Sequence, residues 1–175
     1  MTATAVATWG LFVAFVIHDG EEWFTMPGWG SRNAERLRRI YPRIPPWLLL
    51  RLDPPAVRAR LAIALMGIIF LAAAADGVRT GGRSVFYQVV LIGFGVHSMF
   101  HLAQAVLARG YTPGVISAVL VVAPFSLWAW REIESAGSVG TDLSGLVVLA
   151  VVLIAPVIVG VNLAAFALTK PFDRR

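Results

Sequence analysis

Three histidines and two glutamates are the side chains of this 175-residue sequence best suited to chemistry. His18 precedes Glu21 and Glu22 by three and four residues, so these side chains share one face of a helix. His97 and His101 are four residues apart and share a face in the same way. Neutral imidazole and carboxylate groups bind zinc, iron and manganese. The five residues are therefore candidate metal ligands, provided that the two distant segments meet.

The chemistry of such a cluster would be that of an activated water. Three histidine ligands with an open fourth position activate water, and a nearby glutamate can serve as the base. We expect His18, His97 and His101 to hold a divalent metal, zinc first and iron or manganese as alternatives, with Glu22 as ligand or base and Glu21 as ligand or supporting group. A di-iron centre is a second option, although the His-x-x-Glu spacing occurs only once and in reversed order. Without a metal, the same groups would form a hydrogen-bonded lock between two helices.

The composition places these residues in a membrane protein. Hydrophobic residues make up 58% of the chain and charged residues 14%, which suits neither a disordered chain nor a soluble domain. Apolar runs long enough to span a bilayer as helices cover approximately residues 5–26, 57–75, 85–107, 114–130 and 143–168. The first run lacks the basic residues that begin a signal peptide. We therefore predict an all-α, polytopic bundle of five transmembrane helices, forming one domain over residues 1–175, with a basic interfacial loop at 27–56.

Depth in the membrane provides an independent check on the cluster. Ionisable groups inside a bilayer cost roughly 2.5–3.5 kcal/mol each, so they are functional candidates. His18 lies nine residues before Pro27, and His101 lies nine residues before Gly110. Both are about 13 Å from the same end of the bundle at the rise of an α-helix. The histidines of the first and third spans are therefore expected in one layer.

The distribution of basic residues predicts the orientation and the partners. Twelve arginines and lysines lie at one end of the predicted bundle and three at the other, which predicts an outer N-terminus and a cytoplasmic C-terminus. The larger group comprises Arg32, Arg36, Arg38, Arg39, Arg43, Arg51, Arg58, Arg60, Arg109, Lys170, Arg174 and Arg175. We interpret this charge as a signal for lipid headgroups and not for nucleic acid. The sequence contains no cysteine, which excludes disulfides, thiolate ligands and thiol nucleophiles.

Local signals predict how the spans are joined. Ser31 is expected to cap a short interfacial helix, and Asp53 to cap the second span ahead of a proline. Asp76-Gly77 and Gly81-Gly82 are expected to close a tight turn. Thr112 is expected to cap the fourth span.

Two motifs resemble a known family. The segment His18-Asp19-Gly20-Glu21-Glu22 is similar to the defining motif of the HXXEE family of bacterial membrane proteins. That family has a further histidine, matched here by His97 or His101, and a Tyr-x-Pro-Gly motif, matched by Tyr111-Thr112-Pro113-Gly114. The resemblance covers most of the chain and implies a helical protein of the bacterial inner membrane, without an established activity. Tyr111 would lie near the mouth of the site and is a candidate catalytic group, although the capping pattern favours a structural turn.

Three functions are compatible with these features. The first is a metal-dependent membrane enzyme, hydrolase-like, that acts on a lipidic or amphipathic substrate. A metal held by three histidines resembles the zinc site of ceramidase-like membrane hydrolases, by analogy only. The eight-histidine membrane desaturases and hydroxylases are excluded, because this sequence has only three histidines. The second is a small metal or proton transporter, which would require a homo-oligomer because five helices form at best a small pore. The third is a scaffold in which the polar cluster only holds helices together.

Overall fold

The computed structural model describes residues 2–140 and 142–170, and this part of the chain is helical, with no strand. The helices are α1 (Ala3–Thr25), α2 (Trp29–Ile40), α3 (Pro46–Arg51), α4 (Ala56–Thr80), α5 (Val85–Leu107), α6 (Val115–Ser117), a π-helix (Ala118–Val122), α7 (Ala123–Ser135) and α8 (Leu143–Thr169). The all-α prediction is confirmed.

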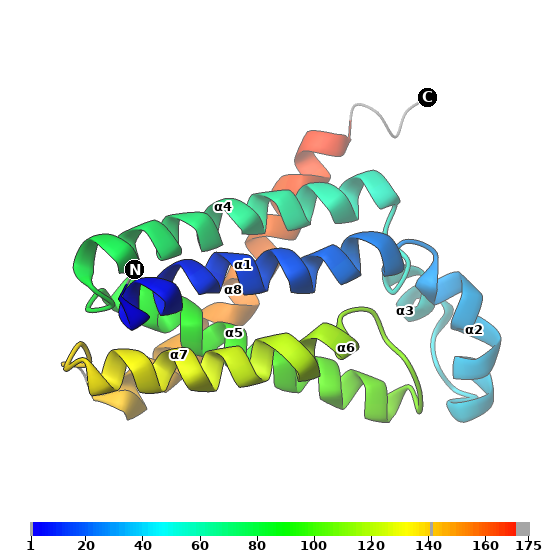
Figure 1. Ribbon diagram of the computed structural model, residues 1–175. Coiled ribbons are helices and arrows are strands. Elements are labelled where there is room, and N and C mark those ends of the chain that lie inside the picture. The colour runs from blue at the N-terminus through cyan, green and yellow to red at the C-terminus, as the bar shows by residue number, and fades with distance from the viewer. Residues whose placement is uncertain (1, 141, 171–175) are drawn as a thin grey trace.

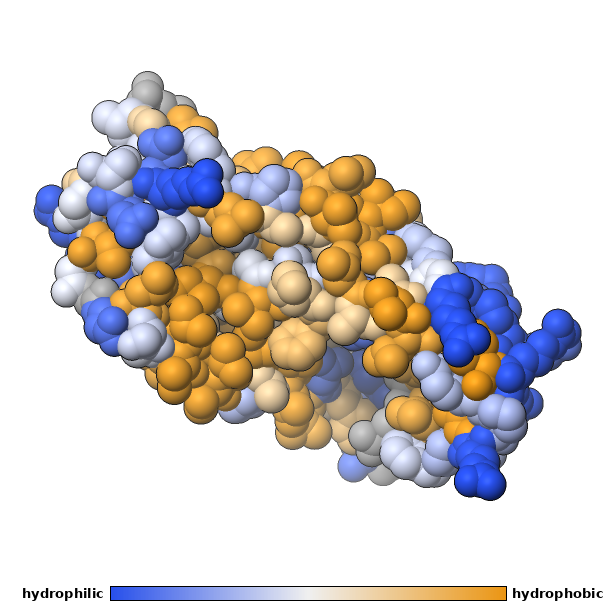
Figure 2. Space-filling model, turned by 90° about the horizontal axis from the view of Figure 1, so that it is seen from below, coloured by the Kyte–Doolittle hydropathy of each residue, from blue (hydrophilic) through white to orange (hydrophobic). Residues whose placement is uncertain are grey.

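Five of these segments are long and apolar enough to cross a membrane. They are α1, α4, α5, the continuous segment Val115–Ser135, and α8. The segments α1, α4, α5 and Val115–Ser135 run back and forth along the long axis of the bundle, whereas α8 crosses behind them at a steep angle, and α2 and α3 lie together at one end (Figure 1). Apolar side chains cover the middle of the molecule, whereas hydrophilic residues gather at its two ends (Figure 2). The predicted five-span membrane bundle is therefore confirmed. Arg174 and Arg175 lie outside the described residues.

The second span is longer than predicted. Helix α4 continues to Thr80, so the expected turn is wrong at Asp76 and Gly77, which lie within the helix, and confirmed at residues 81–82. The carboxylate of Asp76 instead pairs with Arg79 at 2.7 Å on the next turn. The helix ends at Gly81, whose φ of 60° is the left-handed conformation that glycine adopts easily. Gly77 has a packing role, because a Cβ there would lie 2.6 Å from the ring of Tyr87.

The predicted role of Asp53 as a cap of α4 is also wrong. Helix α4 begins at Ala56 after two prolines, and Pro55 at its N-cap offers no side-chain hydrogen bond. Asp53 instead accepts hydrogen bonds from the backbone N–H groups of Gly28 at 2.7 Å and Ser31 at 3.1 Å. These are free N–H groups at the start of α2. Asp53 therefore fixes the interfacial helix α2 beneath the end of α1.

The fourth span contains one irregular turn. Between Ala118 and Val122 the helix widens to a π-helix, and the N–H of Ala123 bonds to the carbonyl of Ala118. Pro124 explains the irregularity, because proline has no N–H and its ring crowds the carbonyl four residues earlier. The span starts at Val115 with Gly114 at the N-cap, so the predicted cap by Thr112 is wrong.

The core of the bundle ends where the histidines begin. Leu11 and Phe15 of α1 pack with Phe70 of α4 and with Leu91 and Phe94 of α5. His18 lies one turn beyond Phe15 and His97 one turn beyond Phe94, and the rings of His18 and Phe94 are 5.7 Å apart. These side-chain contacts between α1 and α5 across the core position the polar cluster.

Candidate metal centre

Helices α1 and α5 bring the three histidines together. His18, His97 and His101 each offer a ring nitrogen, and these three atoms lie within 4.8 Å of one another. His18 and His101 are only 1% and 3% exposed, and His97 is half-buried. The histidines that the sequence placed at the same depth in the first and third spans therefore form one cluster in the structure. This buried group of imidazoles could hold a metal ion.

The hydrogen bonds of His101 define which of its nitrogens is free. Its Nδ1 lies 2.9 Å from the carbonyl oxygen of Pro113, and a carbonyl can only accept. Nδ1 therefore carries the hydrogen, and Nε2 carries a lone pair. That Nε2 lies 2.8 Å from Nε2 of His97 and 3.4 Å from Oε1 of Glu22. The free nitrogen of His101 therefore faces the centre of the cluster.

His18 follows the same pattern through a serine. Its Nδ1 lies 3.0 Å from Oγ of Ser117, and this hydroxyl donates to Oε2 of Glu21 at 2.5 Å. Because Ser117 donates to the carboxylate, it accepts from the Nδ1–H of His18. Nε2 of His18 then carries the lone pair, and it is buried with no hydrogen-bond partner among the residues that the structure describes. The chain Glu21–Ser117–His18 thus orients a free nitrogen, as supporting groups do around metal ligands.

The structure separates the roles of the two glutamates. Glu22 is buried and its Oε1 faces His101. Glu21 is turned to the other side, where it accepts hydrogen bonds from the Ser117 backbone N–H at 2.7 Å and from the Tyr111 hydroxyl at 2.8 Å. Of the two roles predicted for Glu21, this arrangement favours the supporting one over direct ligation. Asp19 lies apart, lining a groove between α1 and α4.

The Tyr-x-Pro-Gly segment contacts the cluster at three of its four residues. The Tyr111 hydroxyl donates to Glu21, and the Pro113 carbonyl accepts from His101. Gly114 has a φ of 82°, and a Cβ there would lie 2.6 Å from His101 and 2.8 Å from Glu22. Burial raises the pKa of the Tyr111 phenol, and the hydrogen bond to Glu21 raises it as well. The phenol is therefore a hydrogen donor throughout the neutral range.

Two contributors to the site were missed from the sequence. Ser117 links His18 to Glu21, and a single serine in an apolar run carries no pattern of its own. Its place one turn after the Tyr-x-Pro-Gly motif is the only signal that could have identified it. The indole of Trp29 donates to the Tyr111 carbonyl at 3.1 Å and so holds α2 against the same segment.

Fold and site together define a multi-pass helical membrane protein with a buried histidine cluster. A family model described as "Protein of unknown function with HXXEE motif" matches residues 9–129, and the chain belongs to this family. The matched range contains every residue of the cluster and the whole Tyr-x-Pro-Gly segment, whereas α8 lies outside it. No curated protein and no solved structure matches the chain.

Proposed function

We propose that this protein is a metal-dependent membrane enzyme of the hydrolase type that acts on a lipidic or amphipathic substrate. His18, His97 and His101 bind one divalent cation, zinc in the first place and iron or manganese as alternatives. The single observation that carries this proposal is the buried Nε2 of His18, which has no hydrogen-bond partner although it lies beside two other imidazoles. An unpaired buried acceptor costs about 1–3 kcal/mol, and a bound cation would remove that cost.

The proposed chemistry follows from the ligand count. A cation with three histidine ligands keeps a fourth position at which a bound water loses a proton near neutral pH. Glu22 is placed to act as the base or as a further ligand, because its Oε1 lies 3.4 Å from His101 Nε2. Glu21 acts through Ser117 by keeping the hydrogen of His18 on Nδ1. Tyr111 is assigned a positioning role, since its hydroxyl is engaged by Glu21.

Metal content separates this proposal from the scaffold. Protein purified in detergent should contain about one metal ion per chain by mass spectrometry of the elements, zinc before the others. His97→Ala should lose that metal. Gln88→Ala, which alters a buried polar residue at the other end of the bundle, should keep it. Wild-type protein without metal after zinc addition, or equal metal in the two variants, would overturn the proposal.

Turnover then separates an enzyme from a transporter. Zinc-loaded protein is incubated with a total lipid extract, and the products are compared by mass spectrometry with those from His97→Ala. New hydrolysis products only with the wild type support the enzyme. Zinc or proton flux into liposomes without any product supports the transporter, which would also require a homo-oligomer.

We also propose a location in the bacterial inner membrane with the N-terminus outside. The excess of basic residues at the α2 end supports this orientation under the positive-inside rule. Because the chain has no cysteine, single substitutions report accessibility cleanly. Arg83→Cys should react with a membrane-impermeant maleimide on intact spheroplasts, whereas Arg38→Cys should react only after lysis. The reverse pattern would invert the topology.

A further inference from the structure

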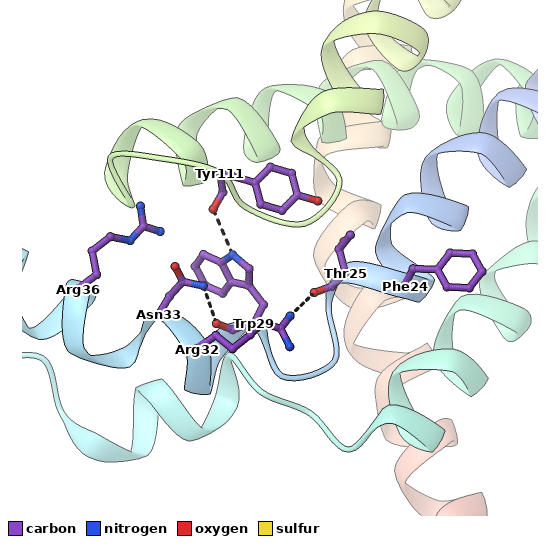
Figure 3. A pocket seen from close by; sticks show the side chains of 7 residues that line it. All are labelled: Phe24, Thr25, Trp29, Arg32, Asn33, Arg36 and Tyr111. Atoms are coloured by element: carbon purple, nitrogen blue, oxygen red, sulfur yellow. Dashed lines mark hydrogen bonds between the residues drawn. The ribbon is translucent and has the colours of Figure 1, made fainter.

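A pocket of about 540 Å³ opens beside the metal centre at the α2 end of the bundle. Its walls come from the last residues of α1, the first two turns of α2, and Tyr111 (Figure 3). Tyr111 belongs to both the pocket and the centre, because its hydroxyl donates to Glu21. A molecule in this pocket would therefore lie one side chain away from the histidine cluster.

Two arginines of α2 line this pocket, and Figure 3 shows their guanidinium groups on either side of the Trp29 indole. Arg32 and Arg36 are four residues apart, and each reaches only a backbone carbonyl at 3.4 Å, that of Thr25 and of Arg109 respectively. Within residues 2–140 and 142–170, neither has a carboxylate at ion-pair distance, in contrast to Arg39, which pairs with Glu35. Nε of Arg36 is buried without a hydrogen-bond partner. The pocket is thus lined by two guanidinium groups that have N–H donors available for a ligand.

The backbone around these arginines leaves room for them. Arg36 lies over Gly110 and Arg32 over Gly28, and at each glycine a Cβ would overlap the guanidinium. Trp29 also lines the pocket, and its indole donates to the Tyr111 carbonyl (Figure 3). Arg36 is therefore half-buried beside Gly110, whereas Arg32 is exposed at the edge of the pocket.

We propose that this pocket binds the phosphate group of an anionic phospholipid, and that this lipid is the substrate class of the proposed enzyme, on which the inference rests. Arginine forks bind phosphate oxygens in pairs, which makes a phosphate the best match for a pocket that is lined by two arginines. The lipidic source is favoured over free phosphate by Phe24 on the rim, whose side chain is 79% exposed at the end of a membrane span. An acyl chain leaving the pocket would pass along this apolar flank.

Calorimetry in detergent tests the pocket with dioctanoyl phosphatidate as the probe. Arg32→Gln/Arg36→Gln should weaken binding by about tenfold or more, because charged hydrogen bonds are among the stronger ones. The matched control is Arg38→Gln/Arg39→Gln, which removes two charges from the same helix outside the pocket. The control should bind like the wild type. Thermal unfolding of both variants verifies that they are folded.

Several outcomes would overturn the inference. Equal losses in the two double variants would indicate diffuse charge attraction. Equal affinity for dioctanoyl phosphatidylcholine would show that the headgroup is not selected. Inorganic phosphate that binds as tightly as phosphatidate would assign the pocket to a free anion and not to a lipid.

Repeating the titration in His97→Ala separates this inference from the proposed function. If phosphatidate binds both the wild type and His97→Ala, and the wild type proves to hold no metal, the proposed metalloenzyme would be refuted and the headgroup pocket would stand. If the wild type binds metal but does not bind phosphatidate, the headgroup pocket would be refuted and the proposed metalloenzyme would stand.

Discussion

Two buried polar groups in this bundle use their hydrogen bonds in opposite ways. The side chains of Tyr87, Gln88 and Ser138 form one of these groups, called the remote group because it lies at the end remote from α2. Each of its donors reaches a backbone carbonyl. The Tyr87 hydroxyl donates to Ala7 at 3.1 Å, and the Gln88 amide donates to Gly82 at 2.9 Å and to Ser138 at 3.1 Å. In the histidine cluster the Nδ1 donors of His18 and His101 point outward to the supporting residues, and their Nε2 atoms point inward, where that of His101 lies 2.8 Å from Nε2 of His97.

The difference is one of balance between donors and acceptors. The remote group leaves one buried side-chain atom unpaired, the neutral oxygen of Gln88. In the cluster the unpaired atom is Nε2 of His18, and it converges with a nitrogen of His97 and of His101, while the Glu22 carboxylate lies 3.4 Å from His101. An unpaired buried acceptor is costly, and a cation is the ligand that could pair with all three imidazoles. We therefore interpret the remote group as helix packing and the histidine cluster, whose ring nitrogens converge, as a binding site.

Substitutions at two glycines should give the largest difference in zinc affinity. Gly114→Ala should lower zinc affinity by about 100-fold, the upper end for a supporting group, because its Cβ would displace both His101 and Glu22. Gly137→Ala is the matched control, since Gly137 has a φ of 66° and nothing within 4 Å. Both variants lose about 1–2 kcal/mol of stability to left-handed backbone strain. Isothermal titration with zinc separates them, and equal zinc affinities would refute the crowding argument.

Two serines give the next largest difference. Ser117→Ala should lower zinc affinity by about 10- to 100-fold, because His18 loses the hydroxyl that keeps its hydrogen on Nδ1. Ser138→Ala removes a hydroxyl that donates to the Gly81 carbonyl at 2.7 Å in the remote group. It should leave zinc affinity unchanged and lower only the free energy of unfolding. If Ser117→Ala bound zinc like the wild type, the proposed link from His18 to Glu21 would not contribute to zinc binding.

Sequence patterns were sufficient for the fold and for the outline of the cluster. Helical spacing placed His18 with Glu22, and His97 with His101, on single faces. Counting from the predicted end of each span placed both faces at the same depth, because a transmembrane helix has a fixed rise per residue. In a soluble protein no such common boundary exists. The membrane therefore made a long-range contact predictable.

The supporting groups could not be predicted because they depend on tertiary hydrogen bonds. Ser117 meets His18 across 99 residues of sequence, and the Pro113 carbonyl is a backbone atom that no residue type reveals. Asp53 illustrates the same limit in the loops. Its local pattern indicates a cap of α4, yet its carboxylate binds the start of α2, which approaches only in the folded bundle.

The remote group predicts a smaller and purely structural effect. Tyr87→Phe removes the hydroxyl bonded to Ala7 from a side chain that is 0% exposed. The free energy of unfolding should fall by about 0.6 kcal/mol, the usual size of a hydrogen bond between membrane helices. Unfolding in a denaturing detergent measures this loss, and Tyr41→Phe, at an exposed tyrosine, should lose less. A change in zinc affinity in Tyr87→Phe would mean that the two polar groups are coupled.

The smallest effect is expected where the cluster meets solvent. Tyr111→Phe removes one hydrogen bond from Glu21, which keeps those from Ser117, so zinc affinity should fall only about threefold. Because burial and Glu21 raise the pKa of the phenol, the folded state holds this proton more tightly than the unfolded chain does. The stabilisation by Tyr111 is therefore complete below about pH 10 and is lost as the pH rises through the folded pKa. The difference in free energy of unfolding between wild type and Tyr111→Phe should stay constant from about pH 6 to about pH 9 and shrink above it. A difference that already disappears near neutral pH would mean that the phenol is not the donor to Glu21.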